Sequence, residues 1–395
     1  MKKRVALLAA FALLFCSCGA SGVGRAEAVA VPAVSPCPTP EPQSQTKTIE
    51  LSFTASGDNL IHDGIYSQAA RRAQGNGYDF APCYADVQDF YAQHDINWIN
   101  QETLVNNEIL PSTYPCFSTP GEMGHTLYDV GFRVFNLSNN HVYDQGAAGL
   151  AATYRFWSEM PEDALTCGLY AGTDDDGIAL QTVQGVTIAY LGYTEHTNGI
   201  PTPAGAEWNV VYTKELDKLQ AQIEKAAALA DIVVVSNHWG VEGSHLVTDT
   251  QRALAQKQAE WGADVIIGTG PHVVQSAEWL DTPDGGKTFV AYSLGNFISA
   301  QSSADTMIGA VLELQIHQTV ELDGTKDTEI LSPVLHPTVT HYGTNYSNIH
   351  LYWYKDYTKE LASQHGVHVN APEFSMDYIR SVIADNIPEE FLAVE

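Results

Sequence analysis

Six side chains of this sequence belong to the types that bind divalent metal ions in enzymes. They are two carboxylates, one amide and three imidazoles: Asp58, Glu102, Asn140, His141, His238 and His272. Oxygen and imidazole donors suit Mn, Zn or Fe better than a site of soft thiolates would. Two such ions that share a carboxylate can activate water near neutral pH and hold the attacking and leaving oxygens of a phosphoryl group. A single Asp in such a place is usually a turn residue, so the prediction depends on the whole set.

The elements that must position these side chains alternate between apolar runs and helix-like stretches. Five runs are typical of strands and stop abruptly at polar residues: 48–55, 134–137, 231–235, 265–267 and 288–291. Helices are predicted at 213–230 and 248–261, which are rich in strong helix formers. This alternation favours an α/β sheet, in which ligands bind beyond the carboxyl ends of the strands. Most of the six candidate ligands fall at such ends.

The N-terminus has the features of an export signal. Three basic residues at 2–4 precede an apolar run at 5–15, which is too short to span a bilayer as a helix. A small residue precedes Cys18, so residues 1–18 are predicted to be a lipoprotein-type signal peptide with Cys18 as the lipid anchor. The bulky Phe15 keeps secretion after cleavage open as the alternative. In both cases the protein is expected outside the cytoplasm, anchored to the membrane or secreted.

Composition divides the remaining chain into segments. Prolines recur among polar residues between 32 and 42, so 19–47 is predicted to be an extended tether without a core. The folded domain is expected at 48–320, with a C-terminal extension at 321–395 that packs on it or follows it. No cysteine pair has metal-finger spacing. Disulfides are allowed outside the cytosol, and both a Cys83–Cys116 bridge and unpaired buried thiols remain open.

The charge of the chain excludes one class of partner. The sequence has 19 basic and 47 acidic side chains, for a formal net charge of −28. Such a surface repels nucleic acid. It also repels a polyanion, so a site for phosphate or polyglutamate needs local positive charge. Bound metal ions are the simplest source of that charge.

Seven short motifs occur in an order that is typical of one family. They are GDNLIH (57–62), NQET (100–103), NNHVYDQG (139–146), TNGIP (197–201), HWGVE (238–242), PHVVQ (271–275) and YSLGNF (292–297). With these motifs, the sequence resembles the CapA family of poly-γ-glutamate capsule biosynthesis proteins. The resemblance covers roughly residues 48–320 and is fainter beyond. That family is in turn similar to the calcineurin-like metallophosphoesterases, which implies a four-layer α/β/β/α sandwich with a two-metal site at one sheet edge.

The resemblance also implies a role for each matching residue. Asp58 and His272 would bind a first ion, Asn140 and His238 a second, and Glu102 would bridge both. His141 would protonate the leaving oxygen or steady the transition state, and Asp144 would orient it. Four further residues are predicted to face the substrate: His62, Asn100, Glu242 and Asn296. For Glu242 and Asn296, a helix-terminal or turn role is the alternative.

Two departures from the superfamily pattern each remove an imidazole. The usual Asp-x-His becomes Asp58-Asn59-Leu60, and the expected Gly-x-His-Pro-His has Gly270 in place of its first histidine. The second ion would therefore lose a ligand. Three other histidines could compensate or could be supporting residues: His62, His196 and His245. The sequence thus leaves open two ions, one ion or none.

Three functions remain compatible with these residues. The first is a cell-surface hydrolase-like protein that acts on an anionic envelope polymer or a phosphoester, in the synthesis, export or attachment of poly-γ-glutamate, with capsule synthetase and membrane subunits as partners. The second is a scaffold without catalysis that holds the polymer in the same pocket. The third is a general envelope phosphodiesterase.

Overall fold

The computed structural model of the protein describes residues 46–172 and 176–393. These residues belong to one compact unit that begins at Thr46. The predicted signal peptide at 1–18, its lipid anchor Cys18 and nearly all of the predicted tether at 19–47 lie outside the described residues. Of the helices in the described part of the chain, none is long and apolar enough to cross a membrane.

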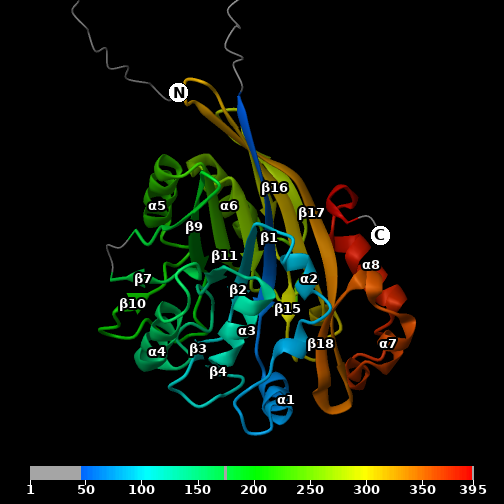
Figure 1. The fold of residues 1–395 in the computed structure, drawn as a ribbon. Coiled ribbons are helices and arrows are strands. Elements are labelled where there is room, and N and C mark those ends of the chain that lie inside the picture. Colours follow the sequence, from blue (N-terminus) through cyan, green and yellow to red (C-terminus); the bar gives the residue numbers. More distant parts are fainter. Residues whose placement is uncertain (1–45, 173–175, 394–395) are drawn as a thin grey trace, which may run out of the picture. The chain divides into compact units, whose positions relative to one another are not determined.

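The larger of two main sheets has eight strands and carries the first strand of the domain near its centre (Figure 1). Its order is β18 (Ser347–Trp353), β17 (Lys326–Gly343), β16 (Ile308–Val320), β1 (Lys47–Asn59), β2 (Ile96–Gln101), β5 (Val134–Asn136) and β6 (Leu165–Cys167), with β15 (Asn296–Ile298) also paired to β1. β1, β2, β5 and β6 are mutually parallel. Their carboxyl ends therefore meet at one end of the sheet.

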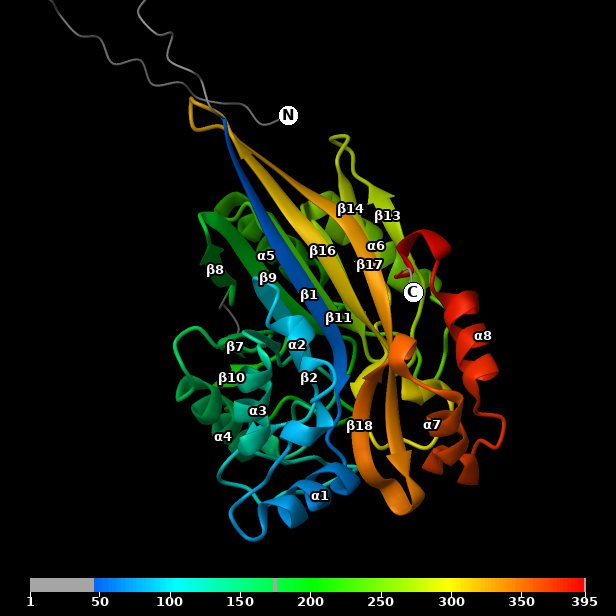
Figure 2. The same cartoon turned by 45° about the vertical axis from the view of Figure 1, so that its right-hand side comes forward.

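The predicted C-terminal extension, 321–395, contributes to this sheet. β17 pairs antiparallel with β16, and β18 pairs antiparallel with β17. Two helices, α7 (Lys359–Gln364) and α8 (Met376–Asn386), lie beside these strands, as Figure 2 shows. Residues on both sides of position 320 thus form one folded unit.

The second main sheet has six strands. Its order is β13 (Ala277–Asp281), β14 (Lys287–Ala291), β12 (Val265–Thr269), β11 (Ile232–His238), β9 (Val186–Thr194) and β8 (Ala179–Val183). The four inner strands are parallel, and the two edge strands are antiparallel to their neighbours. Two small sheets, β3 (Val105–Asn106) with β4 (Thr119–Pro120) and β7 (Tyr170–Ala171) with β10 (Trp208–Asn209), belong to the connecting loops.

Alternate residues of β11 belong to two different cores. Val233 and Val235 lie in a core that includes Leu219 of α5 (Leu216–Leu229), whereas Val234 lies in the core that includes Phe53 of β1. This alternation follows from the period of two in a strand. Because both faces are covered, β11 is a continuous apolar run. The six-stranded sheet therefore packs against helices on one face and against the eight-stranded sheet on the other.

The remaining helices are α1 (Asp63–Ala73), α2 (Gln88–Tyr91), α3 (Glu122–Val130), α4 (Gly146–Ser158) and α6 (Asp249–Trp261). The two predicted helices correspond to α5 and α6, and α6 starts where predicted because Thr248 and Gln251 form a capping box. The α/β class is confirmed, while the four-layer count stays a prediction. Cys83, Cys116 and Cys167 are all free thiols. The alternative of a Cys83–Cys116 disulfide is therefore wrong. The alternative of unpaired buried thiols is confirmed for Cys83 and Cys167, whereas the free Cys116 is half-buried.

One carboxylate of β16 lies between two imidazoles. Glu313 Oε2 is 2.7 Å from His336 Nε2, and Glu313 Oε1 is 3.3 Å from His94 Nε2. Hydrogen bonds from these histidines lower the pKa of Glu313 to about 2. Burial alone would lower the pKa of His94, but Glu313 raises it. The cluster joins β16, β17 and the loop before β2.

The variant Glu313→Gln is expected to lower the melting temperature most between about pH 4.5 and 6.5. Because its folded pKa is lowered, Glu313 stabilises the fold above its unfolded value of 4.5, and this contribution is lost as the pH falls toward 2. Because its folded pKa is raised, His94 stabilises the fold below 6.5, and this contribution is lost at higher pH. Thermal unfolding from pH 3 to 8, with exposed Glu321→Gln as the control, checks this expectation. A difference that is constant with pH would contradict it.

Candidate metal centre

Asp58 lies at the carboxyl end of β1, where three strands meet. It is in register with Asn100 of β2 and with Asn296 of β15. The β1 and β15 backbones approach closely here, because a Cβ at Gly57 would lie 2.0 Å from the Gly295 carbonyl oxygen. Asp58 N–H donates to that same carbonyl at 2.9 Å. Gly57 is therefore required for the pairing that positions Asp58.

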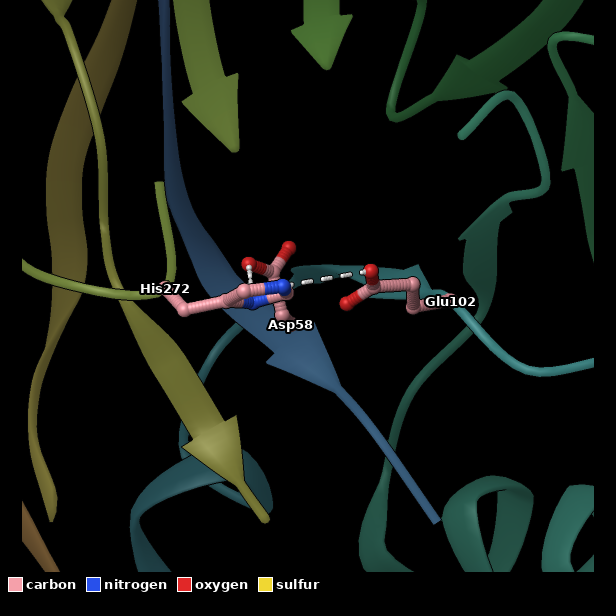
Figure 3. A group of neighbouring side chains, drawn as sticks. All are labelled: Asp58, Glu102 and His272. Carbon is pink, nitrogen blue, oxygen red and sulfur yellow. Dashed lines mark hydrogen bonds and ion pairs between the residues drawn. The ribbon is translucent and has the colours of Figure 1, made fainter. Parts of the chain in front are cut away.

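Asp58, Glu102 and His272 form a compact buried group, drawn in Figure 3. His272 Nδ1 lies 3.0 Å from Asp58 Oδ2, and His272 Nε2 lies 3.7 Å from Glu102 Oε1. Each residue offers a ligand atom within 4.8 Å of those of the other two. Burial alone would raise the pKa of Asp58, but the hydrogen bond and charge of His272 lower it. Burial alone would lower the pKa of His272, but the carboxylates of Glu102 and Asp58 raise it to about 10.

Three imidazole nitrogens surround the Glu102 carboxylate. Besides His272, His238 Nε2 lies 3.7 Å and His141 Nε2 lies 4.0 Å from Glu102 Oε1. Both carboxylate oxygens of Glu102 are buried and neither has a hydrogen-bond partner. Burial raises the pKa of this carboxyl well above its usual range. A buried carboxylate without hydrogen-bond partners is strongly unfavourable, so the arrangement fits a cation bound beside Glu102.

His238 is held ready to bind such a cation. Its Nδ1 lies 3.0 Å from Thr269 Oγ1, which leaves Nε2 toward Glu102. Burial lowers the pKa of His238 to about 3, so the imidazole is neutral at physiological pH. Neutral imidazole is the form that binds metal.

His141 and Asp144 form a separate pair beside this group. His141 Nδ1 lies 2.7 Å from Asp144 Oδ2, which also accepts a hydrogen bond from Phe117 N–H at 2.6 Å. The Phe117 ring meets the imidazole edge-on, with ring centroids 4.7 Å apart. Because Asp144 Oδ2 accepts a hydrogen bond from Nδ1–H of His141, the free nitrogen of His141 is Nε2, on the Glu102 side. This is the geometry of an oriented general acid or base.

The four residues predicted to face the substrate lie in different places. Asn100 is buried and donates from Nδ2 to Asp58 Oδ1 at 2.7 Å, and Asn296 Oδ1 lies 3.1 Å from His272 Nδ1. Asn100 therefore orients Asp58, and Asn296 orients His272. His62 accepts from Ala300 N–H at 3.2 Å and meets Phe117 edge-on, while Glu242 is exposed on the loop after β11. Of the four, only Glu242 has an exposed side chain.

Gly270 occupies a backbone conformation that a histidine would strain. Its φ is +105°, and a Cβ there would lie 3.0 Å from the Trp239 carbonyl oxygen. The Gly270 N–H is 3.3 Å from Asp58 Oδ2, so the backbone itself supports the cluster. His245 Nδ1 lies 2.7 Å from the Val274 carbonyl, and His196 is exposed. Of the residues predicted to hold a second ion, Glu102, Asn140 and His238 therefore remain as candidates in the part of the chain that the structure describes.

Several residues around the site were not assigned a role from the sequence. Asn136 Nδ2 donates to Asn100 Oδ1 at 2.8 Å, and Asn140 Nδ2 donates to Asn198 Oδ1 at 3.3 Å. Phe117 and Thr269 contact the histidines as described above. The sequence could have indicated Asn198, since this residue belongs to the TNGIP motif. It gave no signal for Phe117, which follows no strand and carries no polar group.

The charge balance of the site supports a metal centre. Asp58, Glu102 and Asp144 are all buried, and no Lys or Arg is buried among the residues that the structure describes. The only positive charge that such a site can acquire is therefore on a histidine or on a bound ion. Carboxylate, amide and imidazole donors suit a divalent ion such as Mn, Zn or Fe. The residues thus fit a divalent metal site.

Comparison with known proteins identifies relatives of the chain. The model of the family described as bacterial capsule synthesis protein PGA_cap matches residues 52–301. The PGA biosynthesis protein CapA of Bacillus subtilis (strain 168) is 33% identical over 198 residues, which are 50% of each chain. The capsule biosynthesis protein CapA of Bacillus anthracis is 36% identical over 211 residues, which are 50% of this chain and 48% of the relative. The chain thus spans about half the length of these relatives.

Similar solved structures are more distant. The NAD nucleotidase of Haemophilus influenzae has a TM-score of 0.43 at 14% identity, covering 86% of this chain and 60% of its own. The 5′-nucleotidase of Candida albicans has a TM-score of 0.36 at 9% identity, covering 71% of this chain and 55% of its own. Likenesses at this level support no conclusion about activity.

Proposed function

Because the chain belongs to the bacterial capsule synthesis protein family PGA_cap, we propose that it acts in the synthesis, export or attachment of poly-γ-glutamate or a related envelope polymer through metal-dependent hydrolysis of a phosphoester. The observation that carries this proposal is Glu102, whose two buried oxygens lack hydrogen-bond partners while three imidazole nitrogens lie within 4.0 Å of its Oε1. A purely structural carboxylate would be hydrogen-bonded. Hydrolysis of an amide is the nearest extension of the same chemistry.

The residues divide between metal binding and proton transfer. Asp58, His272 and Glu102 would hold a first divalent ion, and Glu102, Asn140 and His238 would hold a second. Bound ions supply Lewis acidity and the positive charge that a phosphoryl group requires. Asn100 keeps the Asp58 carboxylate turned toward His272 through its hydrogen bond to Oδ1. His141 would hold a proton at Nε2 for the leaving oxygen, because Nδ1 is bonded to Asp144.

The setting of this activity is also part of the proposal. The protein would work outside the cytoplasm, held at the membrane by a lipid on Cys18, with secretion as the alternative. Its substrate would be an anionic envelope polymer or a phosphoester, and capsule synthetase and membrane subunits would be its partners. The net charge of −28 disfavours nucleic acid. It also implies that an anionic substrate is accepted only where bound metal compensates the charge.

The proposal is tested with metal-stripped protein that is reloaded with Mn²⁺. Metal content and hydrolysis of bis(p-nitrophenyl) phosphate and p-nitrophenyl phosphate are measured together. We expect bound metal and Mn²⁺-dependent hydrolysis that EDTA abolishes. Protein that binds no metal and hydrolyses neither ester would refute the proposal.

Gly270 favours a second candidate function. Since this position removes an imidazole from the second-ion ligands, the same pocket could hold an anionic polymer without hydrolysing it. Bound metal without hydrolysis of either ester would support this scaffold. Hydrolysis that depends on Mn²⁺ would exclude it.

A further inference from the structure

A tight turn beside the metal centre carries Asn198. The turn spans residues 197–200 and is closed by a hydrogen bond from Ile200 N–H to the Thr197 carbonyl at 2.8 Å. Its two central residues, Asn198 and Gly199, have φ of +52° and +73°. Positive φ at both positions is the requirement of a type I′ turn, for which Asn-Gly is the preferred pair. The sequence therefore specifies this turn locally.

The turn is held in place by the buried side chain of Thr197, while Asn198 itself is exposed. Thr197 is buried, and its Oγ1 donates to the Ile200 carbonyl at 2.7 Å and lies 3.1 Å from the Tyr212 hydroxyl. Asn198 nevertheless reaches the site, since its Oδ1 accepts from Asn140 Nδ2 at 3.3 Å. An exposed loop residue thus contacts a buried candidate metal ligand.

This contact determines which end of the Asn140 amide is free. The Asn140 amide nitrogen donates a hydrogen bond to Asn198 Oδ1, so the amide oxygen is the free atom, and it is buried without a hydrogen-bond partner. Only the amide oxygen can bind a cation. A flipped amide would put its nitrogen in the place of this free oxygen and would give Asn198 Oδ1 no donor.

The second side-chain contact of Asn198, with His141, is not a hydrogen bond that could orient a ligand. Asn198 Nδ2 lies 3.4 Å from His141 Nδ1. That imidazole nitrogen already donates to Asp144 Oδ2 at 2.7 Å and cannot accept another proton. The bond to Asn140 is therefore the polar contact through which Asn198 acts on the site.

We propose that Asn198 is a positioning residue that locks the amide of Asn140 with its oxygen toward the second metal ion. This inference rests on the proposed metal centre. It matters because Gly270 leaves only Glu102, Asn140 and His238 to hold that ion. With so few ligands, the orientation of each one has a large effect on affinity.

The test compares Asn198→Gly with Asn198→Asp in the full protein. Glycine keeps the positive φ of the turn but removes the side chain, whereas aspartate tolerates the same φ and keeps an oxygen that accepts from Asn140. Binding of Mn²⁺ to metal-stripped protein is followed by titration calorimetry. We expect Asn198→Gly to weaken the second equivalent about 10- to 100-fold, with the first equivalent unchanged, and Asn198→Asp to bind both as the parent does.

Thermal unfolding in EDTA provides the second measurement. Both variants should melt like the parent, because the turn is intact in each. Asn198→Gly that binds two equivalents with parental affinity would overturn the proposal, as would parental protein that binds only one. Parental protein without any metal would refute the proposed metal centre and this inference together. Metal binding without ester hydrolysis would refute the proposed hydrolysis and leave the effect of Asn198 measurable.

Discussion

His141→Ala is expected to lower Mn²⁺-dependent ester hydrolysis by about 10²- to 10⁴-fold, the range typical of a lost general acid or base. The reason is geometric. His141 Nδ1 is bonded to Asp144 at 2.7 Å, so its Nε2 is the nitrogen free to exchange a proton with the substrate. His141 is not required to hold the first ion, because Asp58, Glu102 and His272 form that group without it. Metal content should therefore be retained.

The measurement is the hydrolysis rate of bis(p-nitrophenyl) phosphate, with metal content determined on the same sample. His350→Ala is a matched control. His350 Nε2 also lies 2.7 Å from a carboxylate oxygen, that of Asp86, but His350 belongs to β18 and not to the candidate site. It should keep the parental rate. Asp144→Asn should give an intermediate loss, since the imidazole would keep its place but lose its preferred tautomer.

The outcomes separate three roles of His141. Parental hydrolysis in His141→Ala would contradict proton transfer by this residue. Loss of metal along with activity would mean that His141 is a ligand instead. A pH profile completes the test, because removal of a general acid or base should eliminate one limb of the profile in the variant.

The main elements of the fold could be predicted from local patterns. β11 was recognisable as a buried strand because both of its faces are apolar, and α6 because its capping residues are adjacent in sequence. β15 could not be predicted, since this three-residue strand exists only through its pairing with β1. The same holds for β17 and β18, whose place in the large sheet depends on β16.

The candidate site was predictable to the extent that its residues follow strands. Asp58 and His272 are 214 residues apart, yet both follow apolar runs. These runs form β1 and β12, which belong to the two different main sheets, so the residues meet through the packing of the sheets rather than as neighbours in one sheet. The contacts behind them were not predictable. Asn100 and Asn296 turn their amides toward a ligand rather than toward open space, and this depends on side-chain direction at the ends of β2 and β15. The reason why position 270 is a glycine was not predictable either, because it depends on the positive φ of that residue, which only the structure gives.

Glu102→Gln is expected to abolish most metal binding while stabilising the metal-free protein. The amide has nearly the same shape as the carboxylate but no charge, so a bridging ligand is lost. Parental protein at a Mn²⁺ concentration 100 times its dissociation constant should gain about 2.7 kcal/mol of stability. The variant should show little of that gain. Glu108→Gln, which removes an exposed carboxylate bonded to Arg155, is the matched control and should keep the full metal response.

The metal-free comparison has an expected pH dependence. Because burial raises the pKa of Glu102 well above its unfolded value of 4.5, the carboxyl loses its proton at a higher pH in the folded protein than in the unfolded chain. The stability of metal-free parental protein should therefore fall as the pH rises above about 4.5. The glutamine variant has no such proton to lose. Its melting temperature in EDTA should exceed that of the parent by a margin that widens from pH 5 to 8.

These two responses of Glu102→Gln distinguish a metal ligand from a structural carboxylate. A structural Glu102 would be stabilising in the absence of metal, so its removal would lower the melting temperature in EDTA, as the loss of a buried hydrogen-bonded carboxylate does. As a metal ligand, Glu102 is unfavourable until the ion binds, because both of its oxygens are buried without hydrogen-bond partners. A variant that is less stable in EDTA and still responds fully to Mn²⁺ would therefore refute the central role of Glu102. A variant that is more stable in EDTA and responds little to Mn²⁺ would instead identify Glu102 as a metal ligand whose buried charge is compensated by the bound ion.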